Sequence, residues 1–486
     1  PSDVTFGSTG ASLSLSLSLL CQPKTRHHFS SDLSFLELKD FSRTLQKRVR
    51  RGGQKKRKEE YEMGSSKPSK DHPQSLTKKF LPWTLYVLFP IATIHLYFYP
   101  INFPLSPTDQ LPPNNPSIIT TSSSPPSPSK EEEKANVEIT CDYTDGKWVH
   151  DKMGPLYNGT TCGTIKDGQN CMSHGRPDMG YLYWRWRPNQ CQLSRFEPKT
   201  FLQLLRNKHL AFVGDSMARN QLESLLCLLA TVSPPDLVYR DGDDNKFRRW
   251  HFATHNFNVS IYWSPFLVKG IEKSETKNHN ELYLDSVDER WASDLDRMDM
   301  IVLSIGHWFL HPAVYFDGDS VLGCHYCTGL NYTEVGFYDV FRKAIRTTLK
   351  AIVGSGKAID VIVTTFSPHH FEGQWDKFGA CPKTKPYKKG EKQLEGMDED
   401  MRRIEVQEVE AVKARLRVEA LDITKLSLMR PDGHPGPYMY PFPFANGIAE
   451  SVQNDCVHWC LPGPVDTWNE ILLDLMKKWE AHSISS

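Results

Sequence analysis

The sequence lacks four features that would assign a chain of 486 residues to a functional class at once. Its 58 Lys and Arg residues equal its 58 Asp and Glu residues, so there is no surplus of basic charge for a nucleic acid. No internal repeat is evident, which excludes a repeat architecture. There is no glycine-rich loop of the kind that cradles phosphates. The Cys-x-x-Cys motif at residues 324–327 has no second pair, so its spacing gives little support to a zinc or redox site.

The zero net charge conceals an uneven distribution along the chain. Residues 1–79 hold 16 basic and 8 acidic side chains, which leaves 42 basic and 50 acidic side chains for residues 80–486. The formal charge of the larger part, about −8, does not favour a strongly acidic polymer as a partner, and a neutral sugar chain fits better. The basic run RVRRGGQKKRK (48–58) matches a nuclear-localisation pattern, which the membrane segment described next overrides.

One apolar run is long enough to cross a bilayer. Residues 80–99, FLPWTLYVLFPIATIHLYFY, contain no acidic or basic side chain apart from His95. Aromatic residues stand near both ends of the run, as they do at membrane interfaces. Because basic residues predominate before it, we predict that the N-terminal side stays cytoplasmic. We interpret the run as an uncleaved signal anchor, and the alternative is a helix buried in a protein core.

The segments on either side of this run do not resemble folded domains. Residues 1–79 form the predicted cytoplasmic tail, and because the first methionine is Met63, we favour residues 1–62 as translated upstream sequence. Residues 100–139 are rich in Pro and Ser and cannot bury enough apolar surface to fold, so we interpret them as an extended stem. Tail, anchor, stem and luminal domain together are the layout of a single-pass Golgi membrane enzyme.

Cysteines and glycosylation sequons agree with a luminal position. Ten of the eleven cysteines follow the anchor, and this even number predicts disulfides. They are Cys141, Cys162, Cys171, Cys191, Cys227, Cys324, Cys327, Cys381, Cys456 and Cys460. We expect Cys324 to pair locally with Cys327, with metal binding as the alternative, and Cys456 and Cys460 to be tied to earlier cysteines. Three Asn-x-Ser/Thr sequons predict N-glycosylation, at Asn158, Asn258 and Asn331.

Strand-like and helix-like patterns alternate through the second half of the chain. Apolar runs predict strands at 209–213, 299–306, 358–366 and 415–423, and helical periodicity follows Ser216 and recurs at 338–354 and 399–416. This alternation predicts an α/β fold with a parallel sheet covered by helices on both faces. We assign residues 196–482 to this domain. Residues 140–195, dense in Cys, Trp and Gly, are predicted to form an irregular subdomain wrapped around it.

The segment FVGDSMARNQ (212–221) places a hydroxyl where a buried strand ends and a helix begins. Gly214 can take a tight turn that a Cβ would obstruct, and Ser216 then lies at the helix N-terminus. Free N–H groups and the helix dipole favour negative charge there, as suits a serine whose attack creates an oxyanion. The alternative is that Asp215 or Ser216 merely caps the helix.

A serine nucleophile needs a base, and a carboxylate–histidine pair stands near the C-terminus in NDCVHWC (454–460). Asp455 and His458 are three residues apart, so on one turn both side chains lie on the same face. The carboxylate can then hold one imidazole nitrogen while the other faces the serine. The alternative is a surface loop with an incidental Asp and His.

In this order, the two segments resemble the GDSL/SGNH hydrolases. In detail the chain resembles the plant trichome birefringence-like family of polysaccharide O-acetyltransferases, over roughly residues 140–480. The matching motifs are CDYTDGKWVHD (141–151), PLYNGTTC (155–162), NCMSHGRPDMGYLYWRWRPNQCQL (170–193), FVGDSMARNQ (212–221), GHWF (306–309) and DCVHWCLPGPVDTWNE (455–470).

By that resemblance, Ser216, Asp455 and His458 are the catalytic triad. The implied reaction moves acetyl from a donor to Ser216 and then to a sugar hydroxyl, with His458 as the base in both steps. No metal and no tightly bound cofactor is implied, and the donor is acetyl-CoA or an acetylated carrier. WSPFLVKGIEK (263–273) and SIGHWF (304–309) look most like the members that acetylate xyloglucan. We therefore expect xyloglucan galactose as the acceptor, ahead of xylan, mannan and pectin.

The resemblance defines the other contacts of the site less closely. Where many members have Asn, this chain has Ser304, so no side-chain amide serves at that position. Candidates for contacts with the substrate or the oxyanion are Gly214, Asp215, Arg219, Asn220, Gly306, His307 and Trp308. Candidates for stacking on sugar rings are Trp184, Trp186, Trp250, Trp263 and Trp375, with a core role as the alternative for each.

Two other functional classes stay open. A polysaccharide acetyl-esterase would use the same triad with water as the acceptor. A wall protein that binds pectin or glucan without catalysis would keep the aromatic residues but need no triad. The intact triad residues argue against binding alone, and the family resemblance favours transfer over hydrolysis. Besides a polysaccharide, we expect a membrane contact through one helix, no nucleic acid, and a Golgi enzyme complex as a candidate partner.

Overall fold

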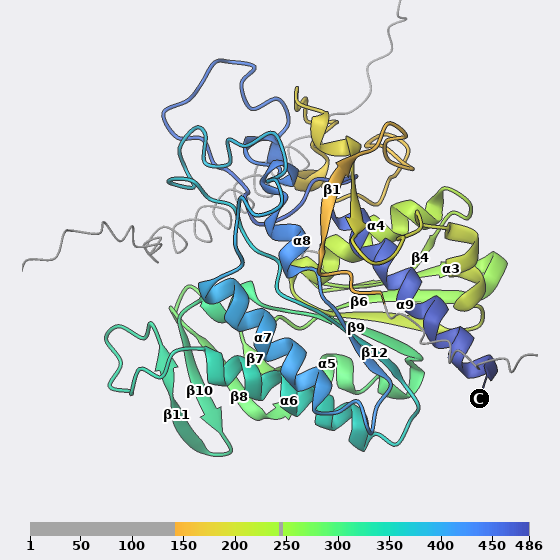
Figure 1. Cartoon of the computed structure of the whole chain (residues 1–486). Helices are drawn as coiled ribbons and strands as arrows, with labels where there is room; N and C mark the ends of the chain where they lie inside the picture. The colour runs from red at the N-terminus through yellow and green to blue at the C-terminus, as the bar shows by residue number, and fades with distance from the viewer. Residues whose placement is uncertain (1–140, 243–245, 486) are drawn as a thin grey trace, which may run out of the picture. The chain divides into compact units, whose positions relative to one another are not determined.

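The structure is a computed structural model that describes residues 141–242 and 246–485 (Figure 1). The predicted cytoplasmic tail, the membrane segment at 80–99 and the stem lie outside these residues. Within the described ranges, no helix is both long and apolar enough to cross a membrane. The elements named below all belong to one structural unit, which includes residues 139–486.

A seven-stranded sheet lies at the centre of this unit, in the order β13-β12-β9-β3-β6-β5-β4. Its strands are β3 (His209–Gly214), β4 (Asp236–Asp241), β5 (Phe247–Phe252), β6 (Phe257–Trp263), β9 (Met300–Ser304), β12 (Asp360–Thr364) and β13 (Val418–Leu421). The first five in the sheet order pair in parallel, which agrees with the predicted parallel sheet, although β6 was not among the predicted strands. The sheet also has two antiparallel strands, β5 and β4, which the sequence did not predict. All six side chains of β4 are exposed, so this strand has no apolar alternation from which to predict it.

Helices cover both faces of this sheet, as predicted. They are α4 (Ser216–Ala230), α6 (Tyr338–Gly354), α7 (Gly396–Glu410) and α9 (Val465–Ser485). Leu210 and Phe212 of β3 point into the hydrophobic core shared with α4 and α9, whereas Ala211 and Val213 point into the core shared with α6 and α7. Figure 1 shows the two helix pairs on opposite sides of the strands. Each fully buried Leu or Phe contributes roughly 1.5–3 kcal/mol relative to an exposed one.

The helix α7 ends earlier than its periodicity predicts. It stops at Glu410, whereas the pattern predicts a helix over 399–416. Beyond it, the amides of Arg415 and Leu416 both donate to the Val412 carbonyl, which closes a turn in place of further helix. This turn brings Leu416 into the core that α7 covers and leads directly to β13.

The sequence did not predict two smaller sheets. A four-stranded sheet in the order β11-β10-β8-β7 contains β7 (Val268–Ile271), β8 (Asn280–Val287), β10 (Ala313–Asp317) and β11 (Ser320–His325). In the Cys-rich subdomain, β1 (Gly146–His150) pairs antiparallel with β2 (Trp184–Pro188). Short α-helices are α3 (Pro198–Leu204), α5 (Glu289–Ala292) and α8 (Thr424–Leu428). The 3₁₀ helices are η1 (Asp167–Gln169), η2 (Gly180–Tyr183), η4 (Ala253–His255), η5 (Leu295–Arg297), η6 (His307–Leu310), η7 (Pro431–Gly433) and η8 (Pro437–Met439).

Tryptophans attach the Cys-rich subdomain to the central sheet. Trp148 Nε1 donates to the Leu426 carbonyl over 2.9 Å, and the Arg430 guanidinium lies 4.4 Å from the Trp148 ring centroid. Trp186 is fully buried in the same core as α4 and α9. The subdomain and the sheet therefore share one hydrophobic core.

Five disulfides pair all ten cysteines of the described residues. They are Cys141–Cys191, Cys162–Cys227, Cys171–Cys460, Cys324–Cys327 and Cys381–Cys456. The local pairing of Cys324 with Cys327 is confirmed. Cys456 and Cys460 are tied to earlier cysteines, as predicted; Cys456 lies between Asp455 and His458, and Cys460 follows His458 by two residues. Two covalent links thus hold this segment against distant parts of the chain.

Candidate active site

Ser216 lies at the corner between β3 and α4, at the carboxyl edge of the parallel strands. Asp215 is the N-cap of α4, and its Oδ1 accepts a hydrogen bond from the Met217 N–H over 2.8 Å. Ser216 therefore takes the first helical position, where its N–H has no acceptor within the helix. The predicted strand–turn–helix is confirmed, and the partial positive charge of the helix end lies at the hydroxyl.

Gly214 is required at this corner because β3 and β9 approach each other closely. A Cβ at Gly214 would lie 1.8 Å from the carbonyl oxygen of Ser304 at the end of β9. The same carbonyl accepts a hydrogen bond of 3.1 Å from the Asp215 N–H. Any larger residue at position 214 would therefore push the serine corner away from β9.

Asp455 and His458 form the predicted carboxylate–imidazole pair. The Asp455 Oδ2 lies 2.7 Å from His458 Nδ1, and its Oδ1 accepts hydrogen bonds from the backbone N–H groups of Val457 and His458. The segment is a bend and not a helical turn, so these backbone bonds, and not helical geometry, bring the two side chains together. Burial alone would raise the pKa of Asp455, but the His458 ring and the two N–H donors hold that pKa well below its usual range.

The pairing fixes which imidazole nitrogen can act as a base. A carboxylate only accepts hydrogen bonds, so His458 Nδ1 carries the proton and Nε2 keeps its lone pair. Nε2 is buried and has no hydrogen-bond partner among the described residues, although 21 % of the His458 side chain is exposed. An imidazole in this state can accept a proton at Nε2.

Asn220 joins the helix of Ser216 to the segment of His458. It lies four residues after Ser216, on the same face of α4. Its Oδ1 accepts from the Trp459 N–H over 2.8 Å, and its Nδ2 donates to the Trp459 carbonyl over 3.3 Å. Since Trp459 directly follows His458, these two bonds hold the segment of His458 against the helix that begins at Ser216.

Two further histidines contact the backbone of His458, one directly and one through the other. His434 Nδ1 lies 2.8 Å from the His458 carbonyl, and His434 Nε2 lies 2.7 Å from His370 Nδ1. His370 Nε2 in turn meets the Leu428 carbonyl at 2.8 Å. Burial lowers the pKa of both rings, that of His370 to about 4. The sequence contains no signal for this chain of close contacts, because its members are far apart and follow no motif.

Comparison with known proteins agrees with this geometry. Residues 193–475 match the profile of PC-Esterase, described as the GDSL/SGNH-like acyl-esterase family found in Pmr5 and Cas1p, and residues 139–192 match the PMR5 N-terminal domain. The chain belongs to the PC-esterase family.

Several relatives match this PC-esterase over most of its length. Xyloglucan O-acetyltransferase 1 of Populus trichocarpa is 68% identical over 437 residues, which are 87% of this chain and 99% of the relative. Xyloglucan O-acetyltransferase 1 of Arabidopsis thaliana is 59% identical over 410 residues, 83% of this chain and 97% of the relative. Protein trichome birefringence-like 25 of Arabidopsis thaliana is 42% identical over 355 residues, 70% of this chain and 78% of the relative. The predicted resemblance is confirmed, and the protein is an O-acetyltransferase.

Several residues predicted to contact substrate have local partners in this PC-esterase. Asp215 is fully buried, and burial raises its pKa to about 6 against the opposing effect of the Met217 and Gly306 N–H groups. The Asp215 Oδ2 itself is buried without a hydrogen-bond partner. His307 Nε2 donates to the Ser367 carbonyl over 2.9 Å, and burial lowers the pKa of His307 to about 3, so the ring is neutral.

Arg219 and Trp308 lie instead around the carboxyl edge next to Ser216. The Arg219 guanidinium lies 5.3 Å from the centroid of Trp263, which ends β6 in register with Gly214. Trp308 meets Trp263 edge to face at 5.5 Å. Of the five tryptophans predicted to stack on sugars, Trp263 is the one that these contacts bring to the serine corner. The other four are Trp186 and Trp250, which are buried in the core, Trp184, which packs partly buried against it, and Trp375, which lies beside Asn454.

The predicted glycosylation sites differ in their surroundings. Asn331 is exposed, whereas Asn158 and Asn258 are half-buried. The Asn158 side chain accepts hydrogen bonds from the Thr160 and Thr161 N–H groups, and the Asn258 side chain meets His251 Nδ1 at 3.1 Å. Glycosylation stays a prediction, and Asn331 is the sequon whose side chain is most open to solvent.

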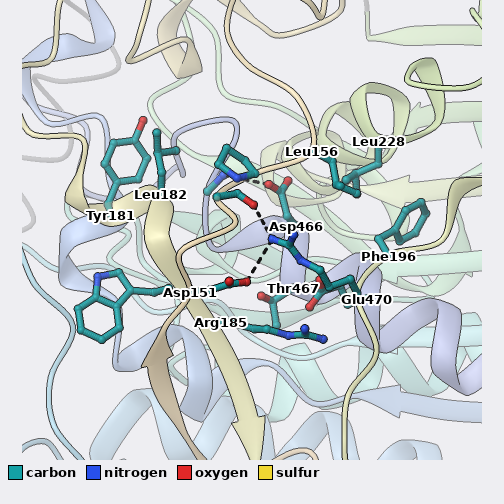
Figure 2. Close-up of a pocket in the computed structure, with 15 residues that line it drawn as sticks. Asp151, Leu156, Tyr181, Leu182, Arg185, Phe196, Leu228, Asp466, Thr467 and Glu470 are labelled. Carbon is teal, nitrogen blue, oxygen red and sulfur yellow. Dashed lines mark hydrogen bonds and ion pairs between the residues drawn. The ribbon is translucent and has the colours of Figure 1, made fainter. Parts of the chain in front are cut away.

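One pocket of the described residues is bounded by the Cys-rich subdomain and α9, and it is lined by none of Ser216, Asp455 and His458 (Figure 2). Arg195 pairs with Asp151 at 3.2 Å on one wall. The Oη of Tyr181 and the Oε2 of Glu470 are buried there without a hydrogen-bond partner. Burial raises the pKa of Glu470 to about 7.

The buried Glu470 of this pocket predicts how the free energy of unfolding changes with pH. From about pH 4.5 to about pH 7, folded protein keeps a proton on Glu470 that unfolded chain releases, so the free energy of unfolding falls as pH rises. The slope from this group is about 1.4 kcal/mol per pH unit. Glu470→Gln should remove that slope, as measured by urea unfolding at several pH values. Glu480→Gln, at an exposed position of the same helix, is the control and should keep the slope. An unchanged slope in Glu470→Gln would contradict the prediction.

Proposed function

We propose that this PC-esterase carries acetyl on Ser216 and transfers it to a hydroxyl of a cell-wall polysaccharide, with xyloglucan as the acceptor. The observation that carries the proposal is the state of His458. Its Nδ1 is held by Asp455 at 2.7 Å, its Nε2 is unpartnered, and the segment is fixed to the helix that begins at Ser216. A serine at a helix N-terminus beside such a base is the arrangement of a serine acyltransferase.

In the first half-reaction, Ser216 Oγ attacks the carbonyl carbon of the acetyl donor. Its proton moves to His458 Nε2, and the carbonyl π pair moves to oxygen. The Asp455 carboxylate stabilises the imidazolium that forms. Collapse of the tetrahedral intermediate breaks the bond to the leaving group, which takes the proton from His458. The product is acetyl-Ser216.

In the second half-reaction, a sugar hydroxyl takes the place of the leaving group. His458 Nε2 accepts the hydroxyl proton while the sugar oxygen attacks the acetyl carbonyl. When the intermediate collapses, the proton returns to Ser216 Oγ and the acetylated sugar leaves. The residues of the site need no metal and no tightly bound cofactor for either step, and the donor is proposed to be acetyl-CoA or an acetylated carrier.

We place the enzyme in the Golgi membrane, with its catalytic domain in the lumen. The apolar segment 80–99 and the surplus of basic residues before it support this orientation. Five disulfides in the described residues support an oxidising compartment. Protease treatment of intact Golgi vesicles should leave the catalytic domain uncut, and its digestion without detergent would contradict the orientation.

The nucleophile is tested by Ser216→Ala in the full-length chain. Acetyl transfer to polysaccharide should fall to background, because the attacking oxygen is gone, while the melting temperature stays near that of the wild type. Ser451→Ala, an exposed serine in the loop before Asp455, is the matched control and should keep full activity. Transfer by Ser216→Ala at more than a few per cent of the wild-type rate would contradict the triad assignment.

The same preparation separates transfer from hydrolysis. An acetyl-esterase with this triad would release acetate from an acetylated polysaccharide and would not acetylate a deacetylated one. We expect the reverse, because relatives at 68% and 59% identity are named as O-acetyltransferases. Release of free acetate as the main product in the presence of acceptor would favour the esterase.

The acceptor is tested with matched oligosaccharides. Galactosylated xyloglucan fragments should be acetylated, whereas the same fragments after removal of galactose should not be, as measured by mass spectrometry. Two observations support this choice: the names of the relatives, and the contact of Trp308 with Trp263, which pairs in register with Gly214, two residues before Ser216. Faster acetylation of xylo-oligosaccharides would overturn the acceptor and leave the acyltransferase mechanism in place.

A further inference from the structure

Arg219 is a buried arginine without a countercharge. It is 8 % exposed, its Nε is buried without a hydrogen-bond acceptor, and no carboxylate of the described residues pairs with it. The contrast with Arg430 is direct, since that buried guanidinium bonds to Asp432 at 2.8 Å and to the Tyr181 carbonyl at 2.7 Å. An unpaired buried charge lowers stability, so its presence beside a nucleophile points to a function.

Two carboxylates around α4 and Trp263 are already engaged by other groups. Glu223 pairs with Arg248 at 3.2 Å, and Arg219 itself lowers the pKa of Arg248 by charge repulsion. Glu272 pairs with Lys246 at 2.9 Å and accepts from Trp263 Nε1. Burial has the larger effect on the pKa of Asp215 and raises it to about 6, whereas Arg219 lowers it. Neither Glu223 nor Glu272 pairs with the guanidinium, which is available to an incoming negative charge.

Arg219 lies on the same face of α4 as Ser216, because Arg219 follows Ser216 by three residues. Two of the other predicted donors near the serine are in use, because the Asn220 amide bonds to Trp459 and His307 donates to Ser367. The Ser216 N–H has no acceptor within its helix, and the buried Arg219 Nε has no acceptor either.

We infer that Arg219 is the second donor to the oxyanion. When Ser216 Oγ attacks the acetyl carbonyl and its proton moves to His458, the carbonyl oxygen becomes negative, and the guanidinium and the Ser216 N–H donate to it. The Trp263 ring, 5.3 Å below the guanidinium, holds the cation in place without neutralising it. This inference rests on the proposed acyl-serine mechanism.

The test is the pre-steady-state burst of p-nitrophenolate when the full-length protein reacts with p-nitrophenyl acetate. Arg219→Met should lower the acylation rate constant by about 100- to 1,000-fold and change the apparent KM by less than about threefold. Arg219→Lys, which keeps a cation, should recover part of the rate. Because Met removes an unpaired buried charge, the melting temperature should stay the same or rise, which a merely structural role would not produce.

Lys246→Met is the matched control, because Lys246 lies over the same Trp263 ring, at 5.5 Å, but is paired with Glu272. Its burst should match that of the wild type. An Arg219→Met burst within threefold of the wild type, or a loss of rate that follows a loss of folded protein, would overturn the inference and leave the triad standing. Absence of any burst and of acetyl-Ser216 in the wild type would overturn the mechanism and the inference together.

Discussion

Two hydrogen bonds between the Asn220 side chain and the Trp459 backbone connect parts of the chain that are 239 residues apart. On one side is the helix that begins at Ser216, and on the other is the segment of Asp455 and His458. Trp459 is itself fully buried, and its indole N–H donates to Ser367, three residues after β12. Trp459 thus joins the segment of His458 to the helix of Ser216 and to the loop that follows β12. The relative position of the serine corner and the Asp–His pair depends on these contacts.

The electrostatics of the site follow from the same arrangement. Asp455 stays ionised although it is buried, because it accepts from His458 Nδ1 and from two backbone N–H groups. Asp215 has fewer donors, and its pKa is raised to about 6. Two neighbouring carboxyls therefore differ in their protonation because one has three donors and the other relies on a helix cap. The unpaired Arg219 adds positive charge on the side where an oxyanion would form.

The sequence predicted those parts of the site that depend on local order. An apolar run that ends in Gly214 predicted the strand end, and the periodicity after Ser216 predicted the helix. The spacing of Asp455 and His458 predicted their pairing, although an Asp-capped bend, and not a helical turn, brings it about. The sequence could not predict the role of Asn220, because its partner lies at the other end of the domain and is a backbone group. It pointed to Asn220 as a substrate contact, whereas the structure buries it completely.

The rest of the fold also contains contacts between distant residues that the sequence could not predict. Apolar runs with helices between them predicted four of the five parallel strands, namely β3, β9, β12 and β13, but not β6. Nor was β4 predicted, since it has six exposed side chains and no pattern that marks it. Cysteine count predicted disulfides, and only the three-dimensional arrangement pairs Cys171 with Cys460 across 289 residues. His370 and His434 are separated by 64 residues, and they come together because their two loops both pack against the segment of His458.

The acyl-serine intermediate is the central claim, and it can be measured directly. The full-length protein is incubated with an isotopically labelled acetyl donor without acceptor, quenched in acid and digested, and the peptides are identified by mass spectrometry. A triad built on Ser216 predicts labelled acetyl on the peptide that contains Ser216, and its loss when a galactosylated xyloglucan fragment is added before the quench. Labelled sugar product formed while the Ser216 peptide never carries the label would contradict the claim.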